Sequence, residues 1–279
     1  MRTLDGKVVA ITGAGSGIGR ALALQAAARG ASLALSDWDA DGLAQTARLA
    51  GVAPHRQLLT DQLDVRDRQA VHDHADAVRR RLGRVNAVVN NAGVALHGDF
   101  EEVSYEDFSW VLDVDLWGVV HGTKAFLPHL IDSGDGHVVN VSSLFGLLGA
   151  AGQTAYNAAK FAVRGFSEAL RQELLLAGHP VQVTCVHPGG IRTAIVRNAR
   201  TTASHDVAEV ARHFDTRLAR TSPERAAEII WAGVLHHRPR VLVGTEAKLL
   251  DALVRVSGAG YQRVLMTAAR RSATAPRRS

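Results

Sequence analysis

The sequence predicts a single α/β domain in which a parallel β-sheet is covered by helices on both faces. Short runs of valine, alanine, leucine and isoleucine alternate along the chain with longer stretches of helical pattern. The short runs are apolar throughout, as strands buried on both faces of a parallel sheet are. A cluster of glycines follows the first run and opens the first helical stretch. These observations favour a doubly wound sheet built from successive β-α-β units.

The expected elements follow one another in regular order. Strands are expected at residues 8–11, 32–36, just before Asp64, and at 86–89, 137–141, 181–186 and 240–244. Helices are expected at residues 20–29, 40–50, in a stretch that runs through Arg81, and at 108–130 and 155–177. This is the order of a Rossmann-like fold. No repeat, low-complexity linker or break in composition occurs before residue 190, so one domain is expected over residues 1–245, followed by a C-terminal helical extension over residues 246–279.

The positive charge of the chain is confined to its C-terminal end. The chain has 279 residues, a formal net charge of +5 and a pI near 9.9. Its last acidic residue is Asp251, after which come six arginines: Arg255, Arg263, Arg270, Arg271, Arg277 and Arg278. The part up to Asp251 has 26 basic and 27 acidic residues and is nearly neutral. A domain that binds nucleic acid usually carries a basic patch on its fold, so we expect no nucleic-acid partner.

Apolar residues accompany these arginines in the C-terminal extension. They are Leu249, Leu250, Leu253, Val254, Val256, Tyr261, Val264, Leu265 and Met266, interrupted by Gly258-Ala259-Gly260. A basic amphipathic segment of this kind can lie on an anionic membrane surface. The alternative, which we favour, is that the apolar face packs against a subunit and leaves a loose arginine-rich end.

The remaining composition argues against several classes of protein. The single cysteine, Cys185, cannot form an internal disulfide, which excludes a disulfide-framework protein. No apolar run approaches the roughly 18 residues of a membrane span, and the first residues lead into a strand rather than a signal peptide. The 13 histidines lack the spacing and carboxylate partner of a metal site, so no metal is expected. We therefore expect a soluble, cytoplasmic protein.

The glycine cluster between the first strand and the first helix predicts a phosphate-binding loop. It reads Thr12-Gly13-Ala14-Gly15-Ser16-Gly17-Ile18-Gly19. Glycines let the backbone turn tightly and approach a pyrophosphate, which the positive end of the following helix attracts. The spacing departs from G-x-G-x-x-G because Ile18 stands where the third glycine would. A tight turn without a ligand is the alternative, but the position between strand and helix favours dinucleotide binding.

Asp37, at the end of the second strand, bears on the choice of cofactor. A carboxylate in this place can bind the ribose hydroxyls of NAD and repel the additional phosphate of NADP. Neither Ser16 nor Trp38 supplies a basic side chain for that phosphate. We therefore predict NAD in preference to NADP. The alternative is that Asp37 is a solvated turn residue in a cluster with Asp39 and Asp41.

Ser143, Tyr156 and Lys160 form the most informative group of residues. Tyr156 and Lys160 are four residues apart in a helix-forming stretch, so their side chains share one face. An ammonium near a phenol lowers its pKa from about 10 and makes it a usable acid and base. Ser143 follows a strand at the carboxyl edge of the sheet, where its hydroxyl could bond a substrate oxygen. A tyrosine–lysine pair by itself is also common on exposed helix surfaces.

Together with further motifs, this group resembles the short-chain dehydrogenase/reductase family over residues 5–245. The motifs are Thr12-Gly13-x-x-x-Gly17-Ile18-Gly19, Asp64-Val65, Asn90-Asn91-Ala92-Gly93, Ser143 placed 13 residues before Tyr156, Tyr156-Asn157-Ala158-Ala159-Lys160, and Pro188-Gly189-Gly190-Ile191-Arg192-Thr193. Their shared order and spacing make the resemblance specific.

The resemblance implies roles for these residues. Tyr156 would be the general acid and base, Lys160 would lower its pKa and hold the nicotinamide ribose, and Ser143 would orient the substrate oxygen. The residues expected to bind the cofactor are Gly13, Ser16, Gly17, Ile18, Gly19, Asp37, Asp64, Val65, Asn91, Ala92, Gly93, Tyr156, Lys160, Pro188, Gly189, Ile191 and Thr193. Asp64 and Val65 would contact the adenine, and Thr193 would help hold the nicotinamide carboxamide.

One residue departs from the family pattern. Members usually carry asparagine where this chain has Asp115, and that asparagine supports a helix kink and a proton relay to the lysine. An aspartate can accept the same hydrogen bonds but has no amide hydrogen to donate. Its charge could also raise the pKa of the Tyr156 phenol. We predict that Asp115 belongs to the catalytic group as a relay member.

The substrate region is less determined by the sequence. In the family, the region corresponding to residues 190–222 is a variable substrate lid, and here residues 194–222 are polar and irregular in pattern. Phe145, Leu147 and Leu148 are either an apolar pocket wall or ordinary core. We predict an NAD-dependent oxidoreductase that acts on an apolar secondary alcohol or ketone, as a homodimer or homotetramer. The alternatives are an NADP-dependent carbonyl reductase and a dinucleotide-binding scaffold without catalysis.

Overall fold

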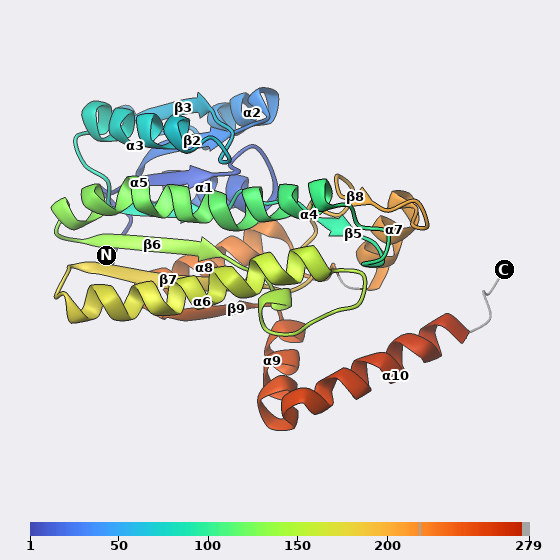
Figure 1. Cartoon of the computed structure of the whole chain (residues 1–279). Coiled ribbons are helices and arrows are strands. Elements are labelled where there is room, and N and C mark those ends of the chain that lie inside the picture. The colour runs from blue at the N-terminus through green and yellow to red at the C-terminus, as the bar shows by residue number, and fades with distance from the viewer. Residues whose placement is uncertain (218, 275–279) are drawn as a thin grey trace.

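A computed structural model of the chain describes residues 1–217 and 219–274 and contains the predicted doubly wound sheet (Figure 1). All seven strands of the main sheet run parallel, in the spatial order β3-β2-β1-β4-β6-β7-β9. The strands are β1 (Val8–Thr12), β2 (Ser32–Asp37), β3 (Leu58–Gln62), β4 (Ala87–Asn90), β6 (Gly136–Val141), β7 (Val181–Pro188) and β9 (Arg240–Val243). The predicted fold class is therefore confirmed.

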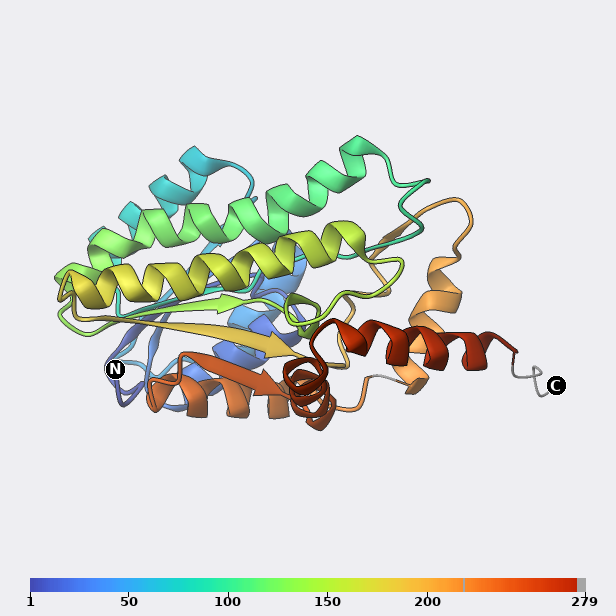
Figure 2. The ribbon, with the colours of Figure 1, turned by 60° about the horizontal axis from the view of Figure 1, so that its bottom comes forward.

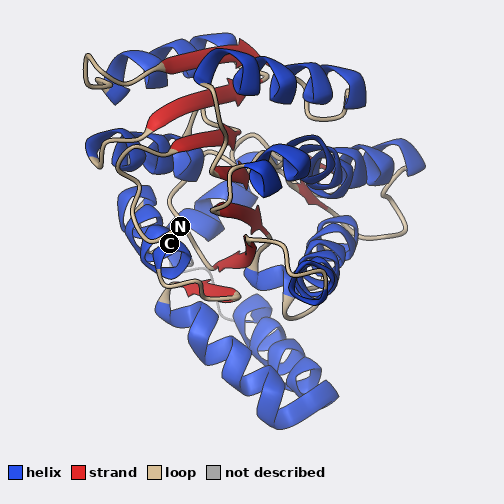
Figure 3. Cartoon of the chain, turned by 90° about the vertical axis from the view of Figure 1, so that its left-hand side faces the viewer, coloured by secondary structure: helices blue, strands red, loops and turns tan. Residues whose placement is uncertain are grey.

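Two layers of helices cover the sheet, as the view along the strands shows (Figure 3). One layer consists of α1 (Gly17–Ala28), α2 (Ala40–Ala50) and α8 (Pro223–Leu235), and the other of α3 (Arg68–Leu82), α5 (Gly118–Asp132) and α6 (Thr154–Leu176).

Alternate residues of the central strand supply both layers of the core. In β1, Val9 and Ile11 pack toward α1 and α8, whereas Val8 and Ala10 pack toward α3 and α5. The largest fully buried side chain among the described residues is Trp231 of α8, whose Nε1 donates to the Leu22 carbonyl at 3.2 Å. The strands β1, β2 and β4 are buried at every residue because helices cover both faces of the sheet.

The helix expected at residues 108–130 is interrupted. The structure has α4 (Tyr105–Leu112), a π-helical turn η1 (Asp113–Trp117) and then α5. A π turn accommodates one extra residue and re-aims the side chains within it. Apolar spacing alone does not reveal such a turn, which here directs Asp115 into the protein interior, where its side chain is fully buried.

The region after β7 is also more ordered than its composition indicates. Where residues 194–222 are irregular in pattern, the structure has a short strand β8 (Arg200–Thr201) and a helix α7 (Val207–Arg217). Strand β8 pairs with β5 (Leu96–His97) in a separate two-stranded sheet. The guanidinium of Arg200 lies 3.8 Å from the ring centre of Trp110 and its Nη1 is 2.7 Å from Asp107. The β5–β8 pairing leaves no local pattern because its two strands are distant in sequence.

After β9 the chain forms two helices that we call the C-terminal arm (residues 245–274). It consists of α9 (Thr245–Ser257), a short turn η3 (Gly258–Gly260) and α10 (Tyr261–Thr274). Figure 1 shows α10 running away from the sheet, and Figure 2 shows that it stays on the side of the strands' carboxyl ends. Of the six C-terminal arginines, Arg277 and Arg278 lie outside the described residues.

A bilayer-spanning helix, long and apolar enough to cross a membrane, is not found among the described residues.

Candidate active site

The glycine loop between β1 and α1 is packed too tightly for larger residues at two positions. Gly13 has φ +65°, and a Cβ there would lie 2.7 Å from the Cα of Ala92. A Cβ on Gly19 would lie 2.0 Å from the Gly13 carbonyl oxygen. The loop thus turns directly over the start of α1, where unpaired backbone N–H groups and the helix dipole favour an anionic group.

Asn91 and Thr12 hold this loop against the end of β4. The Nδ2 of Asn91 donates to the carbonyl oxygens of Thr12 at 3.0 Å and Gly13 at 3.1 Å. The Thr12 hydroxyl accepts from the backbone N–H groups of Asn91 and Ala92, each at 3.1 Å. The Asn-Asn-Ala-Gly motif therefore fixes the shape of the glycine loop.

Asp37 is buried at the carboxyl end of β2 and faces the glycine loop. Its Oδ2 accepts from the backbone N–H of Gly15 at 2.7 Å and its Oδ1 from that of Asp39 at 2.9 Å. It is 9 % exposed, which excludes the alternative of a solvated turn residue. Arg20, which sequence reasoning missed, lies behind the loop and donates to the carbonyl oxygens of Gly15 and Gly42.

The Asp64–Val65 pair follows β3 shortly after its carboxyl end. Asp64 pairs with Arg66 at 2.6 Å, and this hydrogen bond holds the pKa of the carboxyl below its usual range. The Val65 side chain is buried close to Gly118, and its carbonyl oxygen lies 3.1 Å from Nδ1 of His121. Val65 therefore lies next to the start of α5.

The structure brings Ser143, Tyr156 and Lys160 together at the carboxyl ends of β6 and β7. Ser143 follows β6, and its hydroxyl accepts from the Phe145 N–H at 3.1 Å. Tyr156 and Lys160 lie on the first turns of α6, and Nζ of Lys160 lies 5.5 Å from the Tyr156 ring centre. A hydrogen bond from Ser143 to Tyr156 favours the phenolate. The pair is thus directed inward and is not on an exposed helix surface.

Asp115 of the π turn joins this group directly. Its Oδ2 lies 3.0 Å from Nζ of Lys160, and its Oδ1 accepts from the Val94 N–H at 2.8 Å. The lysine also donates to the Val141 carbonyl at 3.3 Å. A Cβ on Gly93 would lie 3.3 Å from Oδ1 of Asp115, so Gly93 allows the backbone after β4 to pass close to the ion pair.

Burial and charge act against each other in this group. Burial raises the pKa of Asp115, although Lys160 opposes this effect. Burial lowers the affinity of Lys160 for its proton, but Asp115 and Tyr156 outweigh it, so the lysine pKa is raised and the group stays an ammonium. The pKa of Tyr156 is raised, chiefly by burial and also by the Asp115 charge, against the opposing effect of Lys160. The phenol is therefore protonated at neutral pH in the free protein.

The segment after β7 faces the glycine loop from the other side. A Cβ on Gly17 would lie 3.0 Å from Cγ2 of Thr193, so the start of α1 and Thr193 are in near contact. Ile191 is buried, and the Gly190 N–H donates at 2.9 Å to Oε1 of Glu246 in the C-terminal arm. The strand β7 ends at Pro188, and Gly189 follows it next to the Glu246 carboxylate. The motif at residues 188–193 thus lies next to the glycine loop at the same edge of the sheet.

Two side chains on the substrate side were not found by sequence reasoning. Asn157 donates through Nδ2 to the carbonyl oxygens of Phe145 at 2.6 Å and Leu148 at 2.8 Å. The hydroxyl oxygen of Tyr261 accepts from the Gly149 N–H at 2.9 Å. The sequence contains no signal for the second contact, because its two residues are far apart in the chain.

Phe145, Leu147 and Leu148, in the loop after β6, were expected to form either an apolar pocket wall or ordinary core. The structure gives a different answer for Phe145 than for the two leucines. Leu147 and Leu148 are 3 % and 2 % exposed, and they pack with Ala247, Leu250 and other residues of the C-terminal arm. Phe145 is only partly buried, and its ring meets that of Tyr156 edge-on at 6.2 Å between centres. The leucines are therefore core residues, whereas Phe145 borders the catalytic group.

The residues present fit a dinucleotide. The glycine loop offers its backbone and a helix start, Asp37 offers a buried carboxylate beside that loop, and Thr193 and Lys160 lie along the same edge of the sheet. No group of three or more histidine, cysteine, aspartate or glutamate side chains that could hold a metal occurs within residues 1–217 and 219–274.

Comparisons with known proteins place the chain in a family. The family model described as short chain dehydrogenase matches residues 7–204. SadH of Mycobacterium tuberculosis (strain H37Rv) is 58% identical over 95% of this chain and 96% of its own length. A short-chain dehydrogenase/reductase of Burkholderia phymatum, solved in complex with NAD, is similar in structure with a TM-score of 0.84 and 30% identity, over 92% of this chain and 95% of that one.

A second solved structure, a short-chain dehydrogenase of Mycobacterium paratuberculosis bound to NAD, gives a TM-score of 0.74 at 27% identity, over 86% of this chain and 97% of that one. The chain belongs to the short-chain dehydrogenase/reductase family of oxidoreductases.

Proposed function

We propose that the chain is an NAD-dependent oxidoreductase that interconverts a secondary alcohol and a ketone, with Tyr156 as the general acid and base. The observation that supports this most directly is the inward-facing group of Ser143, Tyr156 and Lys160 at the carboxyl edge of the sheet. When bound, the nicotinamide exchanges a hydride with the substrate carbon. The NAD carried by the two solved relatives is consistent with the cofactor that Asp37 favours.

The protein side of the reaction consists of one proton transfer and its support. In reduction, the protonated phenol of Tyr156 donates its proton to the substrate oxygen, and Ser143 holds that oxygen by a hydrogen bond. The ammonium of Lys160 stabilises the phenolate that results. In oxidation the same phenolate takes the proton from the alcohol. Because the pKa of Tyr156 is raised in the free protein, the phenol holds at neutral pH the proton that reduction requires.

The substrate that fits is apolar next to the reacting carbon. The ring of Phe145 borders Tyr156, and the loop that carries Phe145 is backed by an apolar cluster. We also propose that residues 190–222 form a lid, because β8 and α7 lie at the same edge of the sheet as the catalytic group (Figure 1).

A panel of hydroxysteroids, fatty alcohols and small ketones tests the proposal with NAD and NADP in parallel. We expect turnover of apolar secondary alcohols or ketones with NAD, and loss of at least about 100-fold in kcat on Tyr156→Phe, the size of a general acid–base contribution. Turnover with NADP alone would support a carbonyl reductase instead. Cofactor binding without turnover, identical for the unmodified protein and Tyr156→Phe, would indicate a scaffold.

A further inference from the structure

The C-terminal arm contacts both loops that form the site. At its start, Oε1 of Glu246 accepts from the Gly190 N–H at 2.9 Å, in the loop after β7. At its middle, the hydroxyl of Tyr261 accepts from the Gly149 N–H at 2.9 Å, in the loop after β6. Each contact is made to a backbone N–H group, so it constrains the loop itself rather than a neighbouring side chain.

An apolar cluster joins the arm to the loop after β6. Leu144, Leu147 and Leu148 of that loop are buried together with Ala247 of α9. Four partly buried residues of the arm complete the cluster: Leu250, Val254, Tyr261 and Leu265. The loop has little hydrogen-bonded structure besides the turn η2 (Leu144–Gly146). Without the arm, its leucines would face solvent.

The loop that the arm supports carries two residues of the candidate site. Ser143 directly precedes η2 and accepts from the Phe145 N–H. Phe145 meets the Tyr156 ring edge-on and is thereby placed against the general acid. Asn157 of α6 donates to two carbonyl oxygens of the loop, so α6 and the arm both hold the loop by hydrogen bonds to its backbone.

We propose that the C-terminal arm positions the site through two separate residues. Tyr261 is a positioning residue for the substrate loop, residues 144–149, and Glu246 is a positioning residue for the cofactor loop, residues 188–190. The proposal rests on the proposed function for what each loop binds. It accounts for the arm as a support for this chain's own site.

Substitutions of the two residues are expected to change different constants: KM for the substrate in the case of Tyr261, and the Kd for NADH in the case of Glu246. Tyr261→Phe removes only the hydroxyl and should raise KM for the alcohol or ketone by about 2- to 10-fold, the size of one hydrogen bond, with the Kd for NADH unchanged. Glu246→Ala should raise the Kd for NADH by about 10-fold, as expected for loss of a charged acceptor. Glu246→Gln retains an acceptor oxygen and should restore NADH binding to within about 3-fold of the unmodified protein.

Hydrogen exchange supplies a readout that does not depend on turnover. Amide exchange should accelerate in the peptide that contains Gly149 on Tyr261→Phe, and in the peptide that contains Gly190 on Glu246→Ala, each without change in the other peptide. Thr267→Ala is the matched control, since the Thr267 hydroxyl donates only to the Arg263 carbonyl within α10. It should leave exchange in both loops, KM and Kd unchanged.

Several results would overturn the proposal. Unchanged exchange in the Gly149 peptide of Tyr261→Phe would show that the hydroxyl does not hold the loop. Faster exchange with an unaltered KM would show that the loop does not shape the substrate site. If the unmodified protein turns over no member of the panel, the proposed function fails, and the exchange and NADH-binding measurements still decide whether the arm positions the two loops.

Discussion

The Nζ of Lys160 lies 3.0 Å from Oδ2 of Asp115, both side chains are buried, and the same Nζ lies 5.5 Å from the centre of the Tyr156 ring. The lysine is therefore an ammonium whose charge is partly balanced by a carboxylate. Balancing the ammonium weakens its effect on the neighbouring phenol. A buried ion pair contributes little net stability but is costly to break on one side only. Asp115 thus contributes to the acid strength of Tyr156 from a π turn four elements earlier in the chain.

Asp115→Asn is expected to shift the pH dependence of alcohol oxidation to lower pH. The Asp115 charge raises the pKa of Tyr156, so its removal lets Lys160 lower that pKa. Oxidation requires the phenolate, and kcat/KM should therefore reach its plateau at a lower pH than in the unmodified protein. Steady-state kinetics between pH 6 and 10, about the range of these groups, measure the shift. An unshifted profile would place Asp115 outside the proton path.

Asp37→Asn is expected to relax the cofactor preference. The carboxylate is held in place by the Gly15 N–H, from where it repels a 2′-phosphate. We expect kcat/KM for NADP to rise by about 10-fold relative to NAD, the size of one removed unfavourable charge contact. Asp41→Asn removes an exposed charge from the same turn and serves as the control. Equal changes in the two variants would mean that general electrostatics, and not Asp37, sets the preference.

Gly19→Ala and Gly165→Ala should have opposite consequences. A Cβ on Gly19 would lie 2.0 Å from the Gly13 carbonyl oxygen, so the glycine loop must deform and NADH binding should weaken at least 10-fold. Gly165 lies in α6 with no heavy atom within 4 Å of the added Cβ. Alanine there should raise the free energy of unfolding by about 0.5–1 kcal/mol and leave binding unchanged. Urea unfolding and NADH fluorescence test both; tight binding by Gly19→Ala would contradict the loop assignment.

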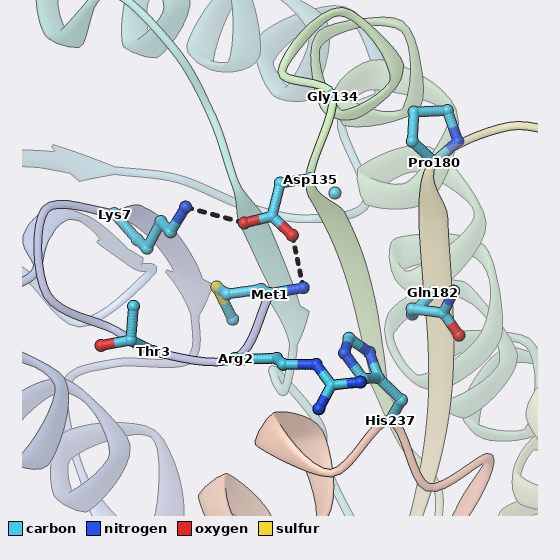
Figure 4. Close-up of a pocket in the computed structure, with 10 residues that line it drawn as sticks. Met1, Arg2, Thr3, Lys7, Gly134, Asp135, Pro180, Gln182 and His237 are labelled. Carbon is cyan, nitrogen blue, oxygen red and sulfur yellow. Dashed lines mark hydrogen bonds and ion pairs between the residues drawn. The ribbon is translucent and has the colours of Figure 1, made fainter.

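Asp135 is expected to stabilise the fold in a pH-dependent way. It lines a hollow at the opposite end of the strands from the site, where it pairs with the Met1 amino group at 2.5 Å and Lys7 at 2.7 Å (Figure 4). Burial works to raise its pKa, but the two cations outweigh it, so the pKa lies below the ordinary 3.8. The unfolded chain then binds the proton more tightly than the folded one. The stabilisation is complete above the ordinary value and is lost as the pH falls through the folded-state value.

We expect Asp135→Asn to lower the free energy of unfolding at pH 7, measured by urea denaturation. The loss should be no more than about 1 kcal/mol because the carboxylate is partly exposed. The difference from the unmodified protein should shrink as the pH is lowered below 3.8. Asp132→Asn, at a neighbouring exposed position, is the control. If Asp135→Asn destabilised the protein equally at pH 7 and below pH 3.8, the ion pairs would be ruled out as the cause of the destabilisation.

Most strands of the main sheet could be predicted because each is rich in valine, leucine, isoleucine or alanine and lies between glycines or polar turns. The strand β3 ends in Thr60, Asp61 and Gln62 and was expected only from its place before Asp64. Two features could not. The π turn at Asp113–Trp117 leaves the apolar spacing of its helix almost unchanged, although it buries an aspartate. The β5–β8 pair is accompanied by contacts of Arg200 with Asp107 and Trp110, which are distant in sequence and which no local pattern records.

The candidate site likewise contains residues that could be predicted from local sequence patterns and residues that could not. Glycine spacing, a strand-end aspartate and a helical tyrosine–lysine spacing are local, and the structure places those residues along one edge of the sheet. The supporting residues Arg20, Glu246 and Tyr261 act through one or two hydrogen bonds each to the backbone of other segments. A bond of this kind requires only one suitable atom at the right place. It therefore leaves no spacing for sequence reasoning to find.

Because Leu147 and Leu148 pack against the arm, the loop after β6 can reach its final packing only after the arm has been synthesised. The residues that cover the loop after β6 are more than a hundred positions further along the chain, at Leu250, Val254, Tyr261 and Leu265. A nascent chain emerges from its N-terminus and can assemble the sheet before these residues leave the ribosome. Translation stopped at Gly244 would thus yield all seven strands and the Tyr156–Lys160 helix, but without the residues of the arm that cover the leucines of that loop.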